Sequence, residues 1–483
     1  MTRADTIKYV DSTISASGDG DSWETAYKTL QEALDAAQST WVIRVAKGTY
    51  APEGTTSAAT FSIDVEGVEI YGGYAGLTGG GTPDARDIDG NETILTGLLP
   101  STSPIVYAWH VVTVADNVGD TEGLDNPPTT RLDGFTIKNG NANGGTTDHR
   151  EDGGGMFIHE GRIFVANCTI INNEADPWGG GVHVLGNSAG DGDGTRFENC
   201  TFDNNTALAN GGGMEISMAR IEVTDCTFSN NTTTADDTDS DGGGGAWVGP
   251  GYADNTEPET KFMGCTFRDN LSATKGGGLA VSTGTHQPIE VVNCSFYENE
   301  AIDPASSETS GIGGGIWSER PLIMVNVTLS KNACRDEGKG GGIYFDSSSW
   351  ESTSAATMTN CVLWRNDSNE DHSQESDQIY VQLDDQEIWP AVTYCCIQDN
   401  ANYTLETLFN TSVNPRFKSL TNNNFILDGT GCDDENCSSF SIDEGSNSPI
   451  TQTYDIGKRL RKIEREGHGE VVDMGCWETQ TAE

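Results

Sequence analysis

Positive charge is scarce in this sequence. Of 483 residues only 27 are lysine or arginine, against 74 aspartates and glutamates, so the formal net charge is −47 at pH 7. Such a surface repels a phosphate backbone, and we expect no nucleic-acid partner. Long apolar runs are also lacking. The longest, 105–109 continuing into 110–112, is far short of the roughly 18 residues that a membrane span needs.

Helical periodicity is nearly absent as well. It appears in one stretch, 25–38, where four residues share a face: Tyr27, Leu30, Leu34 and Ala37. Elsewhere apolar residues alternate over three or four positions, which is typical of short strands. A single amphipathic helix ahead of many strands predicts a cap over the first open strand edge.

The short strands belong to an internal repeat. The motif has an apolar residue at position 0 and at +2, a polar residue at +1 that Val362 interrupts in one copy, and asparagine at +5. Position 0 is occupied in turn by Cys168, Cys200, Cys226, Cys265, Cys294, Val327, Cys361 and Cys395. A third strand precedes position 0, and a glycine triplet with its own alternating segment lies between copies. Three strands per repeat predict an all-β fold, a right-handed parallel β-helix with coils about 4.8 Å apart.

Most cysteines follow this repeat. Seven of the 12 occupy position 0, where we expect a buried column of free thiols that act as small apolar groups. Val327 supports this, because valine fills such a slot but cannot form a disulfide. Cys432 and Cys437 bracket an acidic loop and are candidates for a local disulfide. The sequence leaves open the pairing of Cys334, Cys396, Cys432, Cys437 and Cys476.

The repeat also predicts how the chain is divided. Residues 1–40 form an initial strand and the capping helix, 41–416 the parallel β-helix, and 417–483 an irregular C-terminal cap in which the repeat is lost. Polar insertions fall between strands, where solenoids vary and often bind ligands.

Several motifs resemble those of a known group. Ala46-Lys-Gly-Thr-Tyr50, Tyr71-Gly-Gly-Tyr-Ala-Gly76, the Asn-Cys-Thr-Phe coils and the ending Asp473-Met-Gly-Cys-Trp-Glu478 resemble bacterial secreted right-handed parallel β-helix repeat proteins of the pectate-lyase-like superfamily. The resemblance implies the fold and an extracellular or cell-surface location, and no particular activity. The start lacks the charged-then-apolar pattern of a signal peptide, so we expect a removed leader or another export route. The sequence after Glu478 shows no anchoring pattern, so we expect any attachment to use another route.

One outward position after each glycine triplet carries aromatic, histidine or acidic residues. In successive coils it holds Phe157, His183, Glu215, Trp247, Ala280, Trp317 and Tyr344. Sugar rings stack on aromatic faces and their hydroxyls bond to carboxylates and imidazoles. The pattern therefore predicts an exposed strip that binds polysaccharide or a cell-surface glycan. All but Ala280 are the predicted binding residues. The alternative is an aromatic column that only stabilises the sheet by stacking.

Glu319 and Asp346 are the candidate catalytic residues. They occupy equivalent positions in neighbouring coils, which predicts carboxylates about 5 Å apart that share a proton or hold a cation. Such a pair would suit a glycoside hydrolase or polysaccharide lyase. A pectate-type lyase also needs a basic residue on the same face, and neither Arg320 nor Arg268 meets that requirement. The alternative is two solvated acids.

A structural calcium site is predicted in an acidic loop. Asp237, Asp239 and Asp241 alternate before Gly242, a pattern that converges carboxylates on one hard cation. Val248 stands where an EF-hand has glutamate, so this is not an EF-hand. Asp191 and Asp193 form a weaker candidate. The alternative is a plain acidic loop.

These features together favour a secreted or surface-attached β-helix protein that binds polysaccharide and, as an enzyme, would be a lyase or a hydrolase. The alternative function is non-catalytic: a rigid structural or adhesive rod that self-associates or contacts a partner surface.

Overall fold

The computed structural model describes residues 5–99, 104–115, 128–186, 194–235, 241–250, 260–282, 288–302, 311–335, 338–350, 355–368, 378–383 and 388–398, with four short strands nearer the C-terminus. The chain divides into two compact units. Unit 1 comprises 1–234 with 246–252, and unit 2 comprises 235–245 with 253–483. No helix in the described ranges is long and apolar enough to cross a membrane.

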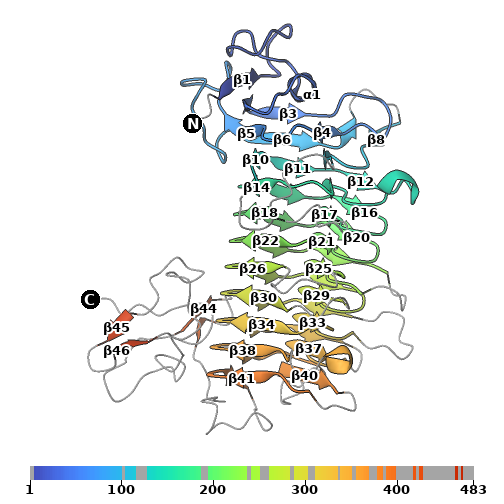
Figure 1. Ribbon diagram of the computed structural model, residues 1–483, viewed down its shortest axis with the longest axis vertical. Coiled ribbons are helices and arrows are strands. Elements are labelled where there is room, and N and C mark those ends of the chain that lie inside the picture. The colour runs from blue at the N-terminus through green and yellow to red at the C-terminus, as the bar shows by residue number, and fades with distance from the viewer. Residues whose placement is uncertain are drawn as a thin grey trace. The chain divides into compact units, whose positions relative to one another are not determined.

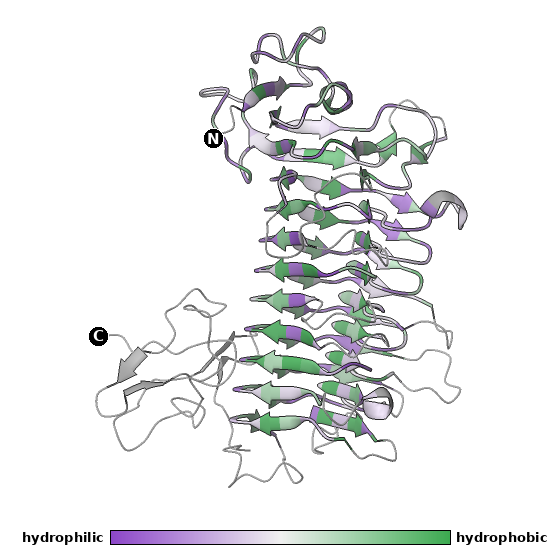
Figure 2. Ribbon diagram, viewed as in Figure 1, coloured by the Kyte–Doolittle hydropathy of each residue, from purple (hydrophilic) through white to green (hydrophobic). Residues whose placement is uncertain are grey.

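Both units are built from parallel sheets in which each strand pairs with its counterpart one coil away, the arrangement of a parallel β-helix (Figure 1). This confirms the predicted fold class. The strands are short and alternate in hydropathy, as Figure 2 shows by colour. Beside the three predicted sheets lies a fourth sheet of two-residue strands at the turn that follows sheet B.

In unit 1, sheet A consists of β1 (Thr6–Val10), β2 (Trp41–Ala46), β5 (Glu69–Tyr74), β10 (Arg131–Asp133), β14 (Phe164–Ala166), β18 (Thr195–Glu198) and β22 (Ile221–Thr224). Sheet B consists of β3 (Gly48–Tyr50), β6 (Thr93–Thr96), β11 (Thr136–Lys138), β15 (Thr169–Ile171), β19 (Thr201–Asp203) and β23 (Thr227–Ser229). Sheet C consists of β4 (Phe61–Ile63), β9 (Val112–Val114), β13 (Met156–His159), β17 (Val182–Leu185), β21 (Met214–Ser217) and β25 (Ala246–Val248). The fourth sheet consists of β12 (Asn141–Ala142), β16 (Glu174–Ala175), β20 (Thr206–Ala207) and β24 (Thr232–Thr233).

In unit 2, sheet A consists of β26 (Lys261–Met263), β30 (Ile289–Val292), β34 (Leu322–Val325), β38 (Thr357–Thr359) and β41 (Ala391–Thr393). Sheet B consists of β27 (Thr266–Arg268), β31 (Ser295–Tyr297), β35 (Thr328–Ser330), β39 (Val362–Trp364) and β42 (Cys396–Ile397). Sheet C consists of β29 (Leu279–Val281), β33 (Ile316–Ser318), β37 (Ile343–Asp346) and β40 (Ile379–Gln382). The fourth sheet consists of β28 (Leu271–Ser272), β32 (Glu300–Ala301) and β36 (Ala333–Cys334).

Short elements outside these sheets complete the described part. Two antiparallel pairs lie in the predicted C-terminal cap: β43 (Phe417–Ser419) with β44 (Asn424–Leu427), and β45 (Ile463–Arg465) with β46 (Gly469–Val471). Unit 1 also holds the hairpin of β7 (Leu98–Leu99) and β8 (Val106–Tyr107) and the 3₁₀ turn η1 (Thr147–His149). Unit 2 holds the 3₁₀ turn η2 (Ser347–Ser349).

The predicted N-terminal helix exists but is shorter than the stretch 25–38 that the apolar periodicity predicted. Helix α1 spans Leu30–Asp35, and Thr29 begins it through a capping box with Glu32. Tyr27 is not helical, because its backbone forms a parallel bridge with Val10 at the end of β1. Leu30, Ala33 and Leu34 are buried, as expected for a helix that covers strands.

The position-0 cysteines form the predicted buried columns of free thiols. In unit 1 the backbone amide of Cys200 lies 3.4 Å from the Sγ of Cys226. Val327 occupies its slot in unit 2 and is fully buried. Cys334 and Cys396 are also free and buried, whereas Cys432, Cys437 and Cys476 lie outside the described residues. Thiols here fill space in the core, as small apolar side chains would.

The +5 asparagines do more than close a turn. In unit 1 the side-chain amide of Asn173 donates to Asn205 Oδ1 at 3.0 Å, and Asn205 donates to Asn231 Oδ1 at 3.0 Å. A second such ladder in unit 2 joins Asn270, Asn299, Asn332 and Asn366, and ends on Gln378. These amides are buried, and satisfying them along the coil axis fixes the register of successive coils.

Candidate functional site

The outward position of sheet C is a true column within each unit; we call it the outer row. In unit 1, pairing of β13, β17, β21 and β25 places Phe157, His183, Glu215 and Trp247 in consecutive register. In unit 2, pairing of β29, β33 and β37 aligns Ala280, Trp317 and Tyr344. The alternation in the sequence therefore predicted which residues share this face.

The predicted exposure of this row was wrong. All six predicted binding residues are buried, with between 1% and 8% of their surface exposed. Neighbouring groups lie over them: the ring of Phe157 is bordered by histidines, and a Cβ added to Gly249 would come within 2.2 Å of the Trp247 ring. Strand alternation fixes the face on which a side chain lies, but says nothing of what covers that face.

In unit 1, two residues of the outer row, His183 and Glu215, lie close to two residues of a turn, Asp152 and His149. We call these four residues the histidine–acid cluster. Asp152 Oδ2 lies 2.8 Å from His149 Nδ1, and Asp152 Oδ1 lies 3.6 Å from His183 Nδ1. On the other side of its ring, His183 Nε2 lies 3.9 Å from Glu215 Oε1. The imidazole of His183 is thus held between two buried carboxylates.

Different kinds of element position these groups. His183 and Glu215 are strand residues in β17 and β21, so parallel pairing fixes their spacing. Asp152 lies in the turn before β13, where it forms a parallel bridge with Trp178, and Gly153 follows with a φ of 57°. The glycine is required there, since this left-handed conformation strains other residues. His149 ends η1 with a φ of 56°, itself an uncommon conformation for a non-glycine residue.

The environment shifts the pKa of three of these groups. Burial raises the pKa of Glu215 to about 7, although the charge of His183 opposes the shift. Burial alone would lower the pKa of His183, but the carboxylates of Glu215 and Asp152 outweigh it and raise that pKa. Burial likewise disfavours the ionised form of Asp152, but His183 and His149 hold its pKa below the usual value. Near neutral pH, Glu215 therefore exchanges a proton beside a fixed Asp–His ion pair.

Several buried polar atoms of this region have no hydrogen-bond partner. They are Asp152 Oδ1, both ring nitrogens of His183, Glu215 Oε2 and Trp247 Nε1. Leaving a buried polar atom unpaired costs about 1–3 kcal/mol, so native proteins seldom keep several together. The set contains both donors and acceptors.

Histidine is concentrated here. Of the seven histidines in the chain, four lie around the ring of Phe157: His110, His149, His159 and His183, with ring centroids 5.4, 5.3, 5.5 and 5.7 Å away. The side chains of His149 and His159 are 44% and 37% exposed, and their centroids are 4.9 Å apart. The rings of His149, His159 and Phe157 thus contact one another pairwise. We call these three rings the ring platform, which borders the histidine–acid cluster.

The outer row of unit 2 has basic neighbours that the sequence interpretation missed. Lys275 Nζ lies 4.3 Å from the ring centroid of Trp317, and Lys339 Nζ lies 4.6 Å from that of Tyr380. Tyr380 in turn stacks on Tyr344, with centroids 5.0 Å apart. Both lysines lie just before a glycine triplet, so their spacing in the sequence was the available signal.

The two candidate catalytic acids have separate surroundings. In-register pairing of β33 with β37 ends at Ser318 and Phe345, one residue before Glu319 and Asp346. The carboxylate of Asp346 accepts a hydrogen bond from the Ser348 amide at 3.1 Å and so caps η2. Proton sharing between Glu319 and Asp346 stays a prediction.

The acidic loop is described only at its end. Asp241 Oδ1 lies 2.7 Å from Lys275 Nζ, and Asp241 Oδ2 accepts a hydrogen bond from Ser282 Oγ at 2.6 Å. Asp237, Asp239, Asp191 and Asp193 lie outside the described residues. Within the described ranges, no group of three or more histidine, cysteine or acidic residues is arranged to hold a metal ion. A calcium ion at Asp241 would have to displace an ammonium group.

Comparison with known proteins gives one family and several solved folds. Residues 15–238 match a family described as a protein of unknown function, DUF1565. No curated protein matches the sequence. Among solved structures, pectate lyase Pel9A is 15% identical with a TM-score of 0.45, covering 98% of this chain and 96% of that one.

Two further solved structures are more distant. A pectin methylesterase from Aspergillus niger is 13% identical with a TM-score of 0.28, covering 80% of this chain and 92% of that one. The catalytic unit of a GH87 α-1,3-glucanase from Streptomyces thermodiastaticus is 13% identical with a TM-score of 0.22, covering 80% and 71%. Likeness at this level says nothing of what this chain does. The protein is a parallel β-helix whose residues 15–238 match the DUF1565 family.

Proposed function

We propose that this protein is an extracellular or cell-surface β-helix protein that binds polysaccharide on the outer side of sheet C. The observation that carries the proposal is the ring platform beside the histidine–acid cluster in unit 1. There, two half-exposed imidazoles lie against each other and against the buried ring of Phe157, next to buried carboxylates with unpaired atoms. Rings that stack on sugar faces, next to groups that bond to hydroxyls, are the usual components of a glycan site.

Asp152 prepares the platform for this role. Its carboxylate accepts a hydrogen bond from His149 Nδ1, which fixes the ring and leaves Nε2 available to a ligand. Because Asp152 is buried and ionised, it holds His149 in one orientation before any ligand arrives. A preorganised ring loses less conformational entropy on binding than a free one does.

The outer row of unit 2 supports the same proposal with different groups. Trp317 and Tyr344 are buried, but Lys275 lies over the Trp317 ring, and Lys339 lies over the ring of Tyr380, which stacks on Tyr344. The two lysines supply donors beside these rings. An enzymatic role, as a glycoside hydrolase or polysaccharide lyase, is a finer proposal than binding. For that role Glu215 has the property expected of a general acid, since burial raises its pKa to about 7.

Binding can be tested directly on a glycan array, followed by calorimetric titration of each positive polysaccharide. We expect His149→Ala with His159→Ala to weaken binding at least about tenfold, as loss of stacking contacts worth about 1.4 kcal/mol would. Trp317→Ala tests the row of unit 2 in the same way. Tyr107→Ala is the matched control, because it removes an exposed ring from β8, a strand that pairs with β7 and does not belong to sheet C.

Two results would contradict the proposal. One is the absence of binding to any neutral or acidic polysaccharide. The other is equal loss of binding in Tyr107→Ala and in the double histidine variant. Filaments in negative-stain images without glycan binding would instead favour the structural or adhesive alternative.

A further inference from the structure

A chain of four side chains leads from a buried carboxyl group to the surface of unit 1. Ser217 Oγ donates a hydrogen bond to Glu215 Oε1 at 3.0 Å, and that carboxyl faces His183 Nε2 at 3.9 Å. The opposite nitrogen of His183 faces Asp152, whose second oxygen bonds to His149. Glu215 is 3% exposed, whereas the side chain of His149 is 44% exposed. The buried acid and the ring platform are therefore linked through charged groups.

The two ends of this chain differ in how firmly they are held. Glu215 and His183 lie within strands that pair on both sides, so neither can move without breaking sheet C. Asp152 and His149 lie in the turn 146–152. The 3₁₀ turn η1 in this segment has no side-chain cap, and His149 carries a positive φ. A change in charge at the strand end is therefore most easily relieved by movement of the turn.

Loss of a proton from Glu215 changes the charge balance of the cluster. With Glu215 neutral, the buried Asp152 carboxylate and His183 imidazolium form a balanced pair. With Glu215 ionised, two carboxylates share one imidazolium, and one buried negative charge is left uncompensated. Repulsion from Glu215 then acts on Asp152, the group that anchors His149.

Other titratable groups surround this chain. His110 Nδ1 lies 3.2 Å from the Gly153 carbonyl oxygen, His159 Nε2 lies 3.8 Å from Glu160, and Arg150 lies over the Trp109 ring. The carboxyl group of Glu151 interacts electrostatically with the negative charges of Asp152 and Asp176. These groups lie around the turn, whereas Glu215 faces Asp152 through His183 alone.

We propose that loss of a proton from Glu215 loosens the turn 146–152 together with His149, so that polysaccharide binds the ring platform more weakly above neutral pH than below it. This regulation rests on the proposed function for its ligand. The movement of the turn does not, because it is a property of the protein alone. The burial that raises the pKa of Glu215 to about 7 places the transition near neutral pH.

The test measures the turn and the ligand separately. Backbone hydrogen exchange of peptides covering 146–152, corrected for intrinsic rates, is compared at pH 6 and pH 8.5 in the full chain. We expect protection to fall about tenfold at pH 8.5, and glycan affinity to fall about five- to tenfold, in the range typical of coupled sites. In Glu215→Gln both differences should vanish. Glu198→Gln, at an exposed acid of β18, is the matched control and should behave as wild type.

Ser217→Ala provides a second variant that keeps every titratable group. It removes a hydrogen bond that favours ionised Glu215, so the midpoint of the change in protection should move to higher pH. Equal protection of the turn at both pH values in the wild type would overturn the inference, as would an unchanged pH dependence in Glu215→Gln. If the turn responds but no glycan binds at either pH, the movement is supported and the proposed function alone fails.

Discussion

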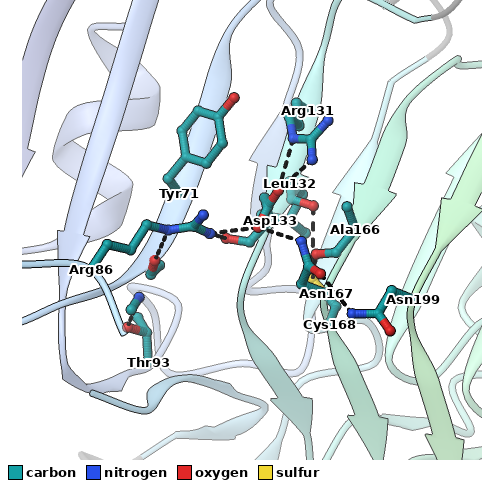
Figure 3. Close-up of polar contacts among 12 residues, drawn as sticks. Tyr71, Arg86, Thr93, Arg131, Leu132, Asp133, Ala166, Asn167, Cys168 and Asn199 are labelled. Atoms are coloured by element: carbon teal, nitrogen blue, oxygen red, sulfur yellow. Dashed lines mark hydrogen bonds and ion pairs between the residues drawn. The ribbon is translucent and has the colours of Figure 1, made fainter. Parts of the chain in front are cut away.

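Two buried polar clusters in the described part of unit 1 differ in how completely their atoms are paired. In the arginine cluster on sheet A, the buried carboxylate of Asp133 accepts hydrogen bonds from Arg86, Arg131 and Asn167 (Figure 3). Arg86 also donates to the Gly72 carbonyl at 2.9 Å. No polar side-chain atom of Arg86, Asp133 or Arg131 is buried without a hydrogen-bond partner.

The histidine–acid cluster on sheet C is the opposite case. His183 lies beyond hydrogen-bond distance of both carboxylates, and several buried atoms are unpaired. A fully paired cluster stabilises the fold, whereas a partly paired one costs stability and persists where function requires it. This difference supports the proposal that the binding side of unit 1 lies on sheet C.

The largest effect is expected at Asp133. Asp133→Asn removes the charge that two arginines share, which leaves them uncompensated in a half-buried site. Breaking such a pair costs about 3–5 kcal/mol, and urea unfolding should show that loss. The control is Asp84→Asn, because Asp84 pairs with Arg44 at a side chain that is 55% exposed and should contribute about 1 kcal/mol or less. Equal losses in both variants would contradict a structural role specific to Asp133.

Substitution of Glu215 is expected to change the free energy of unfolding by less than substitution of Asp133, and in the opposite direction. The pKa of Glu215 in the folded state is raised from 4.5 to about 7. The contribution of its bound proton to the free energy of unfolding is therefore complete below about pH 4.5 and is lost as pH rises through 7. Glu215→Gln should therefore raise the free energy of unfolding at pH 8, by on the order of 2 kcal/mol, and have little effect at pH 5. Chemical denaturation at the two pH values measures this. Destabilisation at pH 8 would mean that the ionised carboxylate is a structural group, like Asp133.

Removal of calcium is expected to change the free energy of unfolding least, through the acidic loop of unit 2. Asp241 is paired with Lys275 and Ser282, so we expect it to act in structure and the predicted calcium site to depend on Asp237 and Asp239. Removing calcium with a chelator should lower the free energy of unfolding by about 1 kcal/mol, as for weak binding of a ligand to the folded state. The chelator effect should persist in Asp241→Asn and disappear in Asp237→Asn. If instead it disappears in Asp241→Asn, Asp241 is a ligand.

The sequence predicted the fold and the outer row because both follow from periodicity. A residue's place in the three-strand repeat determines its sheet, its face and its neighbours one coil away. The cysteine columns, the slot filled by Val327 and the alignment of His183 with Glu215 all follow from this rule.

Features outside the repeat could not be predicted in this way. Asp152 and His149 lie in a turn whose path no alternation encodes, and they carry the anchoring contact of the cluster. The available signal was compositional, since four of the seven histidines fall between residues 110 and 183. Burial of the row was also missed, because strand alternation does not show that a turn residue such as Lys275 lies over the ring of the next coil.

The amide ladder of unit 1 makes its coils interchangeable modules. Each asparagine offers the same oxygen to the amide of the preceding coil, so Asn173 would meet Asn231 as readily as it meets Asn205. Deletion of one whole coil, for example 174–205, would therefore shorten the β-helix of unit 1 by one coil. Asn173 would still have a matching asparagine in the next coil. Evolution can thus change the length of such a protein by adding or removing whole coils, while the surface residues of each coil change independently.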